Sequence, residues 1–342
     1  MGMPFLLAPM AEISHRAFRE LIEDFGGCDY YFSEMISAGA LLAGGTYEKW
    51  YIDNGPRPEK HIFQLVGADS EQISRAAALL DRLECAGVDI NMGCSAPLIR
   101  KTGAGVSWMA SIDRAAELIS RVRPAVKRRL SVKLRIGYKD DFEYLVKFCR
   151  RLEAEGTELI TLHPRTAAEK FKRFARWEYV SMLKQELKIP VAGNGDISTA
   201  HELVYRAHSP CDAVMVGRGA VKQPWIFAAA KEEEIMTAEL DKVSKRKNET
   251  VITAPRNEGS TYPSEKSLEE TGLHFLELLS RHQPPEFHVS RAMRFFNYFC
   301  DNLKWGNYLK NQLNRQESLS GIEHVWREFF RSNCEQPSAS EQ

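Results

Sequence analysis

The stretch LSVKLRIGYKDDFEYLVKFCRRLEAEGTELITLHPRT, residues 130–166, reads as a strand, a helix and a second strand. Residues 130–137 and 158–166 are short apolar runs, and residues 140–156 between them have a helical pattern. Neither run shows clean polar alternation, which is typical of parallel strands buried on both faces. The stretch therefore predicts one β–α–β unit.

The same unit recurs along much of the chain. Strand-like runs occupy residues 5–10, 29–35, 61–67, 88–93, 130–137, 158–166, 189–197 and 211–220, and helical patterns separate them. Eight such units in one domain predict an α/β fold of the (β/α)8 TIM barrel type. The alternative is a doubly wound open sheet, which usually has GxGxxG after its first strand, where this chain has APMAEIS.

The character of the sequence changes after the barrel units. We expect a catalytic barrel domain over residues 1–230 and a polar linker with room for one helix over residues 231–265. A small helical domain rich in arginine and aromatic residues should follow over residues 266–335, with a flexible tail over 336–342. Its aromatic residues include Phe295, Phe296, Tyr298, Phe299 and Trp305.

Composition excludes several classes of protein. No run approaches the ~18 apolar residues of a membrane span, and the N-terminus lacks the basic start of a signal peptide. The seven cysteines are scattered without a CxxC pair, which argues against zinc and iron–sulfur sites and fits a reducing compartment. We expect a cytoplasmic protein with no metal and no membrane association. The oligomeric state is open, with a monomer as the expectation.

The charge is unevenly distributed. The formal net charge is zero, but residues 121–176 hold 16 Lys and Arg against 7 Asp and Glu. Such a segment is either an electrostatic footprint for a polyanion or a set of solvated helix faces. The count alone does not decide between them.

Polar residues fall at the carboxyl ends of the expected strands, where TIM barrels carry their chemistry. A lone glutamine, asparagine or histidine there is more often structural than catalytic. Lys133 inside an apolar strand is different, because it must find an anionic partner or lose its charge. The turns AGNGDIS and VGRGA follow the last two strands, where TIM barrels commonly bind phosphate, and Arg218 could capture an anion there.

Taken together, the motifs LAPMAEISHRAFR, EMISAGAL, FQLVG, DINMGCSAP, RKTGAGVSWM, SVKLRIGY, TLHPRTA, GNGDI and VMVGRGA carry a specific resemblance. Over residues 4–230 the chain resembles the tRNA-dihydrouridine synthases, flavoenzymes that reduce uridine in tRNA to 5,6-dihydrouridine. Ser95 and Pro164 depart from the family pattern, at positions that bear on the local fit to the substrate.

The resemblance implies FMN at the barrel mouth and a helical domain that helps to hold tRNA. The family's proton donor corresponds to Cys94. Its cofactor contacts correspond to Pro9, Met10, Ala11, Gln64, Lys133, His163, Asn194, Gly195, Asp196, Gly217 and Arg218.

The chemistry of uridine fits these expectations. Its C4 carbonyl polarises the C5=C6 bond, so that hydride goes from reduced flavin to C6 and a proton goes to C5. A cysteine thiol is largely protonated near neutral pH and can give up its proton. Gly93 is expected to permit a tight turn beside Cys94. NADPH or NADH would re-reduce the flavin, and the sequence does not choose between them.

The base must leave its stack to be reduced, so the protein must also grip the RNA. The expected substrate contacts are Asn91, Arg165, Lys170, Lys172, Arg173 and Arg176. Which uridine is modified is open. Two other readings also remain open: an FMN barrel reductase that acts on a free small molecule, and a non-catalytic RNA-binding barrel.

Overall fold

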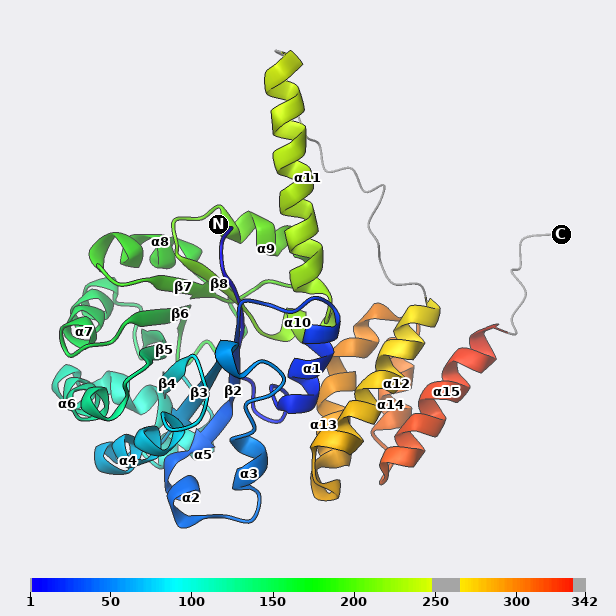
Figure 1. Cartoon of the computed structure of the whole chain (residues 1–342), viewed down its shortest axis with the longest axis horizontal. Coiled ribbons are helices and arrows are strands. Elements are labelled where there is room, and N and C mark those ends of the chain that lie inside the picture. Colours follow the sequence, from blue (N-terminus) through cyan, green and yellow to red (C-terminus); the bar gives the residue numbers. More distant parts are fainter. Residues whose placement is uncertain (1, 248–264, 335–342) are drawn as a thin grey trace.

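A closed barrel of parallel strands forms the centre of the computed structural model, which describes residues 2–247 and 265–334 (Figure 1). The strands pair in chain order, and β8 pairs back with β1. They are β1 (Phe5–Leu7), β2 (Tyr30–Ser37), β3 (His61–Val66), β4 (Gly87–Met92), β5 (Arg129–Gly137), β6 (Leu159–Thr166), β7 (Val191–Asn194) and β8 (Ala213–Val216). The expected (β/α)8 barrel is confirmed, and the open sheet is excluded.

Helices surround the barrel and continue beyond it. The helices that lie between the strands in the sequence, or directly after the last strand, are α1 (Arg16–Asp24), α2 (Ala38–Ala43), α3 (Glu48–Tyr51), α4 (Ser70–Leu80), α5 (Pro97–Lys101), α6 (Ile112–Val122), α7 (Phe142–Ala154), α8 (Trp177–Glu186), α9 (Ala200–Ala207), α10 (Arg218–Lys222) and α11 (Ile226–Lys247). The C-terminal group is α12 (Glu265–His282), α13 (Pro285–Phe299), α14 (Gly306–Leu313) and α15 (Leu319–Cys334).

The barrel interior is apolar at one end and polar at the other. Leu6, Phe32, Ile62, Leu159 and Met215 form a buried cluster separate from the larger core between strands and helices. Polar side chains such as Gln64, Asp89 and Thr161 are fully buried further along the strands. The interior therefore becomes polar toward the carboxyl ends of the strands, where a TIM barrel places its site.

Helix α11 crosses the first of the expected domain boundaries and enters the segment expected to be a linker with room for one helix. Helix α11 runs through residue 230 to Lys247, so the first half of the expected linker is helical, and it extends away from the barrel in Figure 1. Residues 248–264, the rest of that linker, and the expected tail at 336–342 lie outside the described residues. The expected helical domain corresponds to α12 to α15.

An aromatic cluster forms the core of the C-terminal helices. The rings of Phe275 and Phe295 stack at 3.9 Å between centroids, and Trp326 lies 4.6 Å from Phe296. Phe295, Phe296 and Phe299 are each 1% exposed. Most of the aromatic residues noted in the sequence therefore hold this domain together and are not available to stack on RNA, whereas Trp305 is 58% exposed.

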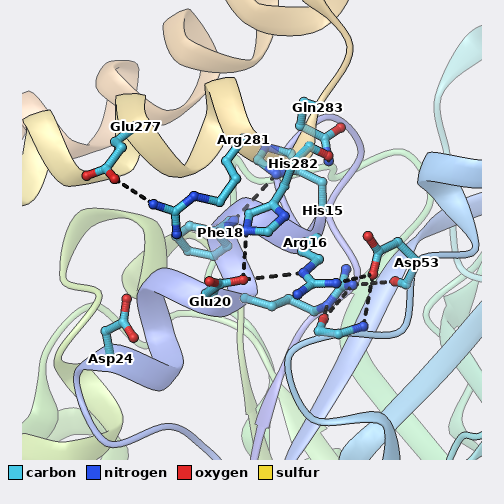
Figure 2. A network of polar contacts seen from close by, with 12 residues as sticks. His15, Arg16, Phe18, Glu20, Asp24, Asp53, Glu277, Arg281, His282 and Gln283 are labelled. Atoms are coloured by element: carbon cyan, nitrogen blue, oxygen red, sulfur yellow. Dashed lines mark hydrogen bonds and ion pairs between the residues drawn. The ribbon is translucent and has the colours of Figure 1, made fainter.

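Helix α12 lies against α1 of the barrel, and polar contacts join the two (Figure 2). His282 Nε2 lies 3.0 Å from Glu20 Oε2. Arg16 lies between Glu20 and Asp53, at 3.3 Å and 3.1 Å. Deeper in the junction, Arg291 of α13 and Glu34 of β2 form an ion pair at 2.8 Å, with both side chains 2–3% exposed. The helical domain is thus fixed to the barrel by buried charge as well as by apolar packing.

The described residues also show whether the chain has a membrane-spanning helix, a cluster of metal ligands or a disulfide. Across 2–247 and 265–334, no helix combines the length and apolarity that a bilayer crossing needs. Nor do these residues gather three or more His, Cys, Asp or Glu side chains as a metal site would require. The cysteines with described side chains are all unpaired: Cys28, Cys85, Cys94, Cys149, Cys211 and Cys300.

Candidate active site

A cavity of about 860 Å³ opens at the carboxyl ends of the strands. Tyr298 and Asp301 from the C-terminal helices form part of its wall. Of the residues expected from the sequence, it is lined by Pro9, Met10, Asn91, Cys94, Lys133, His163, Arg165, Lys170, Asn194, Gly195, Asp196, Gly217 and Arg218. Ala11, Gln64, Lys172, Arg173 and Arg176 are not among its lining residues.

Cys94 directly follows the short turn after β4 and is half-buried at the cavity wall. Its backbone N–H donates to Asn91 Oδ1 at 2.9 Å, and its carbonyl accepts from Val106 N–H at 2.9 Å. Its thiol has no hydrogen-bond partner among the described residues. The backbone is therefore fixed on both sides while Sγ remains free for a ligand.

Two glycines shape this turn for different reasons. A Cβ on Gly93 would lie 3.2 Å from the Leu134 backbone, so glycine at this position allows β5 to approach closely. Gly93 does not have a positive φ, and the tight turn expected there is not the reason for glycine. Gly105 does have a left-handed φ of +60°, and a Cβ there would lie 2.5 Å from the Cys94 carbonyl oxygen.

Lys133 of β5 is a cation of the cavity wall that has no partner among the described residues. It pairs in register with Asn91, and its ammonium has no hydrogen bond or ion pair within the described ranges. The pKa of Lys133 is lowered to about 8, chiefly by burial and also by the charge of Arg135, while Asp89 and Cys94 oppose the shift. The side chain is therefore still largely protonated near neutral pH, and it presents a poorly solvated positive charge to any ligand.

His163, Arg165 and Asp196 form a buried group on the other side. Arg165 is 2% exposed and donates to both Asp196 carboxylate oxygens, at 2.7 Å and 2.8 Å. Its Nη1 lies 3.0 Å from His163 Nε2. Arg165 thus supports the site through its neighbours while it also lines the cavity, and its expected contact with the substrate stays a prediction.

The same contact fixes the state of His163. A guanidinium only donates, so His163 Nε2 accepts and the ring proton lies on Nδ1. Burial lowers the pKa of His163 well below its usual value, and the nearby positive charges of Lys133 and Arg135 add to the effect. His163 is therefore a neutral ring that offers one N–H donor.

The loops after β7 and β8 form the anion end of the cavity. Gly195 has φ +128°, and a Cβ there would lie 3.0 Å from both Ala175 and His163. Asn194 Nδ2 donates to Met215 O at 2.8 Å, which ties the two strands together. Arg218 is exposed beside the Phe171 ring, 4.1 Å from its centroid, and forms no ion pair with the described acidic groups. A free guanidinium beside glycine-rich backbone suits a phosphate group.

The basic segment noted in the sequence is not one surface. Arg129 begins β5, so Lys127, Arg128 and Arg129 lie at the end of the barrel opposite the cavity. Arg176 is held by Glu169, through a 2.9 Å contact, and by Asp140, at 3.2 Å.

The exposed part of the basic segment at the cavity mouth is short. Lys170 lines the cavity, and Lys172 and Arg173 are exposed on the same loop. A polyanion near the mouth would therefore meet residues 170–173 and not the whole segment.

Sequence reasoning missed several residues of the site. Arg135 lines the cavity and links two loops, donating to Gly93 O at 3.0 Å and Lys170 O at 3.2 Å. Strand alternation carried the signal, because Arg135 stands two residues after Lys133 and must share its face. Phe171 and Phe174 also line the cavity, although they are 56% and 89% exposed.

The β1–α1 loop is linked to the C-terminal helices. Glu34 Oε1 accepts from the backbone N–H of Glu12 at 2.6 Å, while Glu34 Oε2 pairs with Arg291. Arg294 of α13 also pairs with Glu12, at 2.6 Å. This loop carries Pro9 and Met10 into the cavity, so α13 supports one wall of the site.

Comparison with known proteins agrees with this arrangement. The family model described as "Dihydrouridine synthase (Dus)" matches residues 6–297. This chain belongs to the dihydrouridine synthase family. It is 34% identical over 235 residues to a probable tRNA-dihydrouridine synthase of Aquifex aeolicus (strain VF5), covering 67% of this chain and 72% of that protein.

A second relative has a more specific name. The tRNA-dihydrouridine(16) synthase of Ralstonia nicotianae is 33% identical over 231 residues, covering 65% of this chain and 70% of that protein. Among solved structures, histamine dehydrogenase from Rhizobium sp. 4-9 superposes with a TM-score of 0.50 at 12% identity, over 68% of this chain and 46% of that one. At that identity the likeness concerns the barrel fold alone.

Proposed function

We propose that this family member is an FMN-dependent tRNA-dihydrouridine synthase in which Cys94 donates the proton to C5 of uridine. The observation that carries the proposal is one cavity in which the thiol of Cys94 and the ammonium of Lys133 both lack a partner among the described residues. Both groups are what a flavin-dependent reduction of a pyrimidine requires of the protein. The names of the relatives support the same activity.

The residues present fit an FMN. The cavity volume of about 860 Å³ lies within the roughly 300–1,000 Å³ of cofactor sites. Lys133 supplies a desolvated positive charge for the electron-rich ring, and His163 supplies one N–H donor. Arg218, with the glycines at 195 and 217, would hold the phosphate. When bound and reduced, the flavin supplies hydride to C6.

The protein's own contribution is positioning and one proton. Bonds from Asn91 and Val106 fix the backbone of Cys94, so the thiol keeps a defined place at the cavity wall. A protonated thiol there acts as general acid as negative charge develops at C5. Arg135 joins the turn beside Cys94 to the loop that carries Lys170, and so couples the acid to the RNA-facing side.

RNA contact is proposed for the loop at residues 170–173 and for the helical wall. Lys170, Lys172 and Arg173 are exposed beside the cavity and can bind phosphates. Exposed Phe174 and the wall residue Tyr298 offer rings at the mouth. We also infer that the protein is a monomer and takes its electrons from NADPH or NADH. The unpaired cysteines of the described residues are in keeping with a cytoplasmic location.

The test begins with the absorption spectrum of the purified chain, in which a bound flavin gives a visible band. Reduced enzyme is then mixed with unmodified tRNA, and separately with free uracil or orotate. The proposal expects a flavin band and dihydrouridine in tRNA only. A colourless protein would favour a non-catalytic RNA-binding barrel, and turnover of the free pyrimidine alone would favour a small-molecule reductase.

A further inference from the structure

A row of buried polar side chains lies inside the barrel beneath Cys94. Gln64 of β3, Asp89 of β4 and Ser131 of β5 are 0–1% exposed and pair in register across three strands. Asp89 Oδ2 accepts from Gln64 Nε2 at 2.7 Å, and Asp89 Oδ1 accepts from Ser131 Oγ at 2.6 Å. Asp89 does not line the cavity, so a ligand there does not explain this buried carboxylate.

The hydrogen bonds of this row have only one consistent direction. An ionised carboxylate only accepts, so the Gln64 atom beside Asp89 is the amide nitrogen. Gln64 Oε1 then faces Asn91 Nδ2, at 2.8 Å, and accepts from it. Asn91 Oδ1 is left to face the backbone of the turn.

That last atom holds the turn that carries the thiol. Asn91 Oδ1 accepts from the backbone N–H of Cys94 at 2.9 Å and of Gly93 at 3.2 Å. If the two amides were reversed, Asn91 NH₂ would face two N–H donors and nothing would accept from them. The orientation of Asn91 is therefore set by the two N–H groups of the turn and, through Gln64, by Asp89.

We propose that Asp89 is a positioning residue that acts through Gln64 and Asn91 to hold the Cys94 backbone, and with it the thiol. The role rests on the proposed function only in its effect on the reaction, because the hydrogen bonds exist without any ligand. The same proposal gives Gln64 a positioning role inside the barrel, because its side chain is fully buried and both of its polar atoms form hydrogen bonds.

The row should respond to pH through Asp89. Burial raises the pKa of Asp89 to about 6, while the hydrogen bonds from Ser131 and Gln64 and the positive charge of Lys133 lower it. Lys133 of β5 is the charged group that acts on Asp89 among the described residues, and Gln64 and Ser131 face it as neutral donors. Above about pH 6 the carboxylate fixes the row, and below it a protonated Asp89 can donate and allow reversal.

Three variants separate positioning from simple packing. Asp89→Leu removes the acceptor. Asp89→Asn keeps the shape of the side chain but presents one acceptor and one donor, as a protonated Asp89 does, and it cannot titrate. Ser131→Ala is the matched control, because it removes a buried hydrogen bond to Asp89 without touching the link from Gln64 to Cys94.

Two measurements are made on full-length protein. The first is single-turnover dihydrouridine formation by pre-reduced enzyme with tRNA, across the pH range around the Asp89 pKa of about 6. We expect a drop of about tenfold or more at neutral pH for Asp89→Leu, as misplacement of a reacting group predicts. Asp89→Asn should react at every pH at the rate that wild type shows only below the Asp89 pKa, with no acid decline of its own, and Ser131→Ala should move the wild-type decline to higher pH.

The second measurement is hydrogen exchange of the Gly93 and Cys94 amides, which requires no activity. Both amides should exchange faster in Asp89→Leu than in wild type, whereas in Ser131→Ala they should exchange at the wild-type rate. A wild type that makes no dihydrouridine would overturn the proposed function but leave this exchange test intact. Unchanged exchange in Asp89→Leu, or an acid decline that persists in Asp89→Asn, would overturn the positioning role.

Discussion

Gly105 lies against Cys94 so closely that a Cβ on Gly105 would meet the Cys94 carbonyl oxygen at 2.5 Å and the Cys94 Cβ at 3.1 Å. The next residue, Val106, donates its N–H to that same carbonyl at 2.9 Å. The glycine-rich turn that follows α5 is thus part of the support for the thiol.

Replacing Gly105 with alanine should displace Cys94. The overlap with the Cys94 backbone must be relieved by movement, so we expect slower single-turnover reduction of tRNA with little change in tRNA affinity. Gly103→Ala is the matched control. Gly103 also has a left-handed φ, +82°, but its Cβ would meet no atom closer than 3.7 Å.

Both substitutions should cost about 1–2 kcal/mol of stability through the left-handed backbone. Only Gly105→Ala should slow the reaction. Equal rates for the two variants would show that the Gly105 turn does not affect the rate of the reaction.

Lys133→Met should weaken FMN binding, and the FMN affinity of this variant should no longer decline as the pH becomes alkaline. The pKa of Lys133 in the free protein is about 8, so the ammonium is charged below that pH and lost as pH rises through it. Wild-type affinity for FMN should therefore decline above about pH 8. Fluorescence titration of the apoprotein at several pH values measures this, and an identical decline in Lys133→Met would assign it to another group.

Arg218→Ala should raise the FMN dissociation constant about 10- to 100-fold, the usual effect of losing one charge-assisted contact. Arg206→Ala is a suitable control. Arg206 also lies over an aromatic ring, 4.7 Å from the Trp177 centroid, but it is outside the cavity lining. Unchanged FMN affinity in Arg218→Ala would remove the phosphate role from this loop.

Two arginines of α13 should differ sharply in their effect on stability. Arg291→Met leaves Glu34 buried without its partner, and burial already raises the pKa of Glu34 against the effect of Arg291. Breaking such a pair costs about 3–5 kcal/mol. The pair of Arg294 and Glu12 has side chains 59% and 43% exposed, so Arg294→Met should cost about 0–1 kcal/mol. Urea unfolding distinguishes the two, and equal small losses would mean that the buried pair does not hold the domains together.

The barrel could be predicted because each strand and helix has its own local signal. Buried parallel strands need apolar residues throughout, as in residues 130–137, and eight such runs with helices between them leave few alternatives. The ends of the strands could be located for the same reason. That was sufficient to place Cys94, Lys133 and Arg218 at one cavity.

The partners of polar side chains could not be predicted in this way. Arg165 is engaged by Asp196, and Gln64 by Asp89 and Asn91, through contacts between strands that spacing along one strand does not reveal. Likewise the sequence showed that Phe295 and Phe299 belong to an aromatic helical domain, but not that they would be buried against other rings, because a helix pattern does not say which partner covers each face.

The most direct test of the account is the rate of the chemical step without Cys94. Pre-reduced enzyme is mixed with unmodified tRNA, and dihydrouridine is measured over a single turnover in wild type, Cys94→Ala and Cys211→Ala. Cys211 is a second half-buried free cysteine, but it lies before β8 and outside the cavity lining. Because general acid catalysis contributes about two to four decades in rate, Cys94→Ala should bind FMN normally yet react at least about a hundredfold more slowly, while Cys211→Ala matches wild type. A Cys94→Ala rate within a few-fold of wild type would contradict the account, since it would make Cys94 a space-filling thiol.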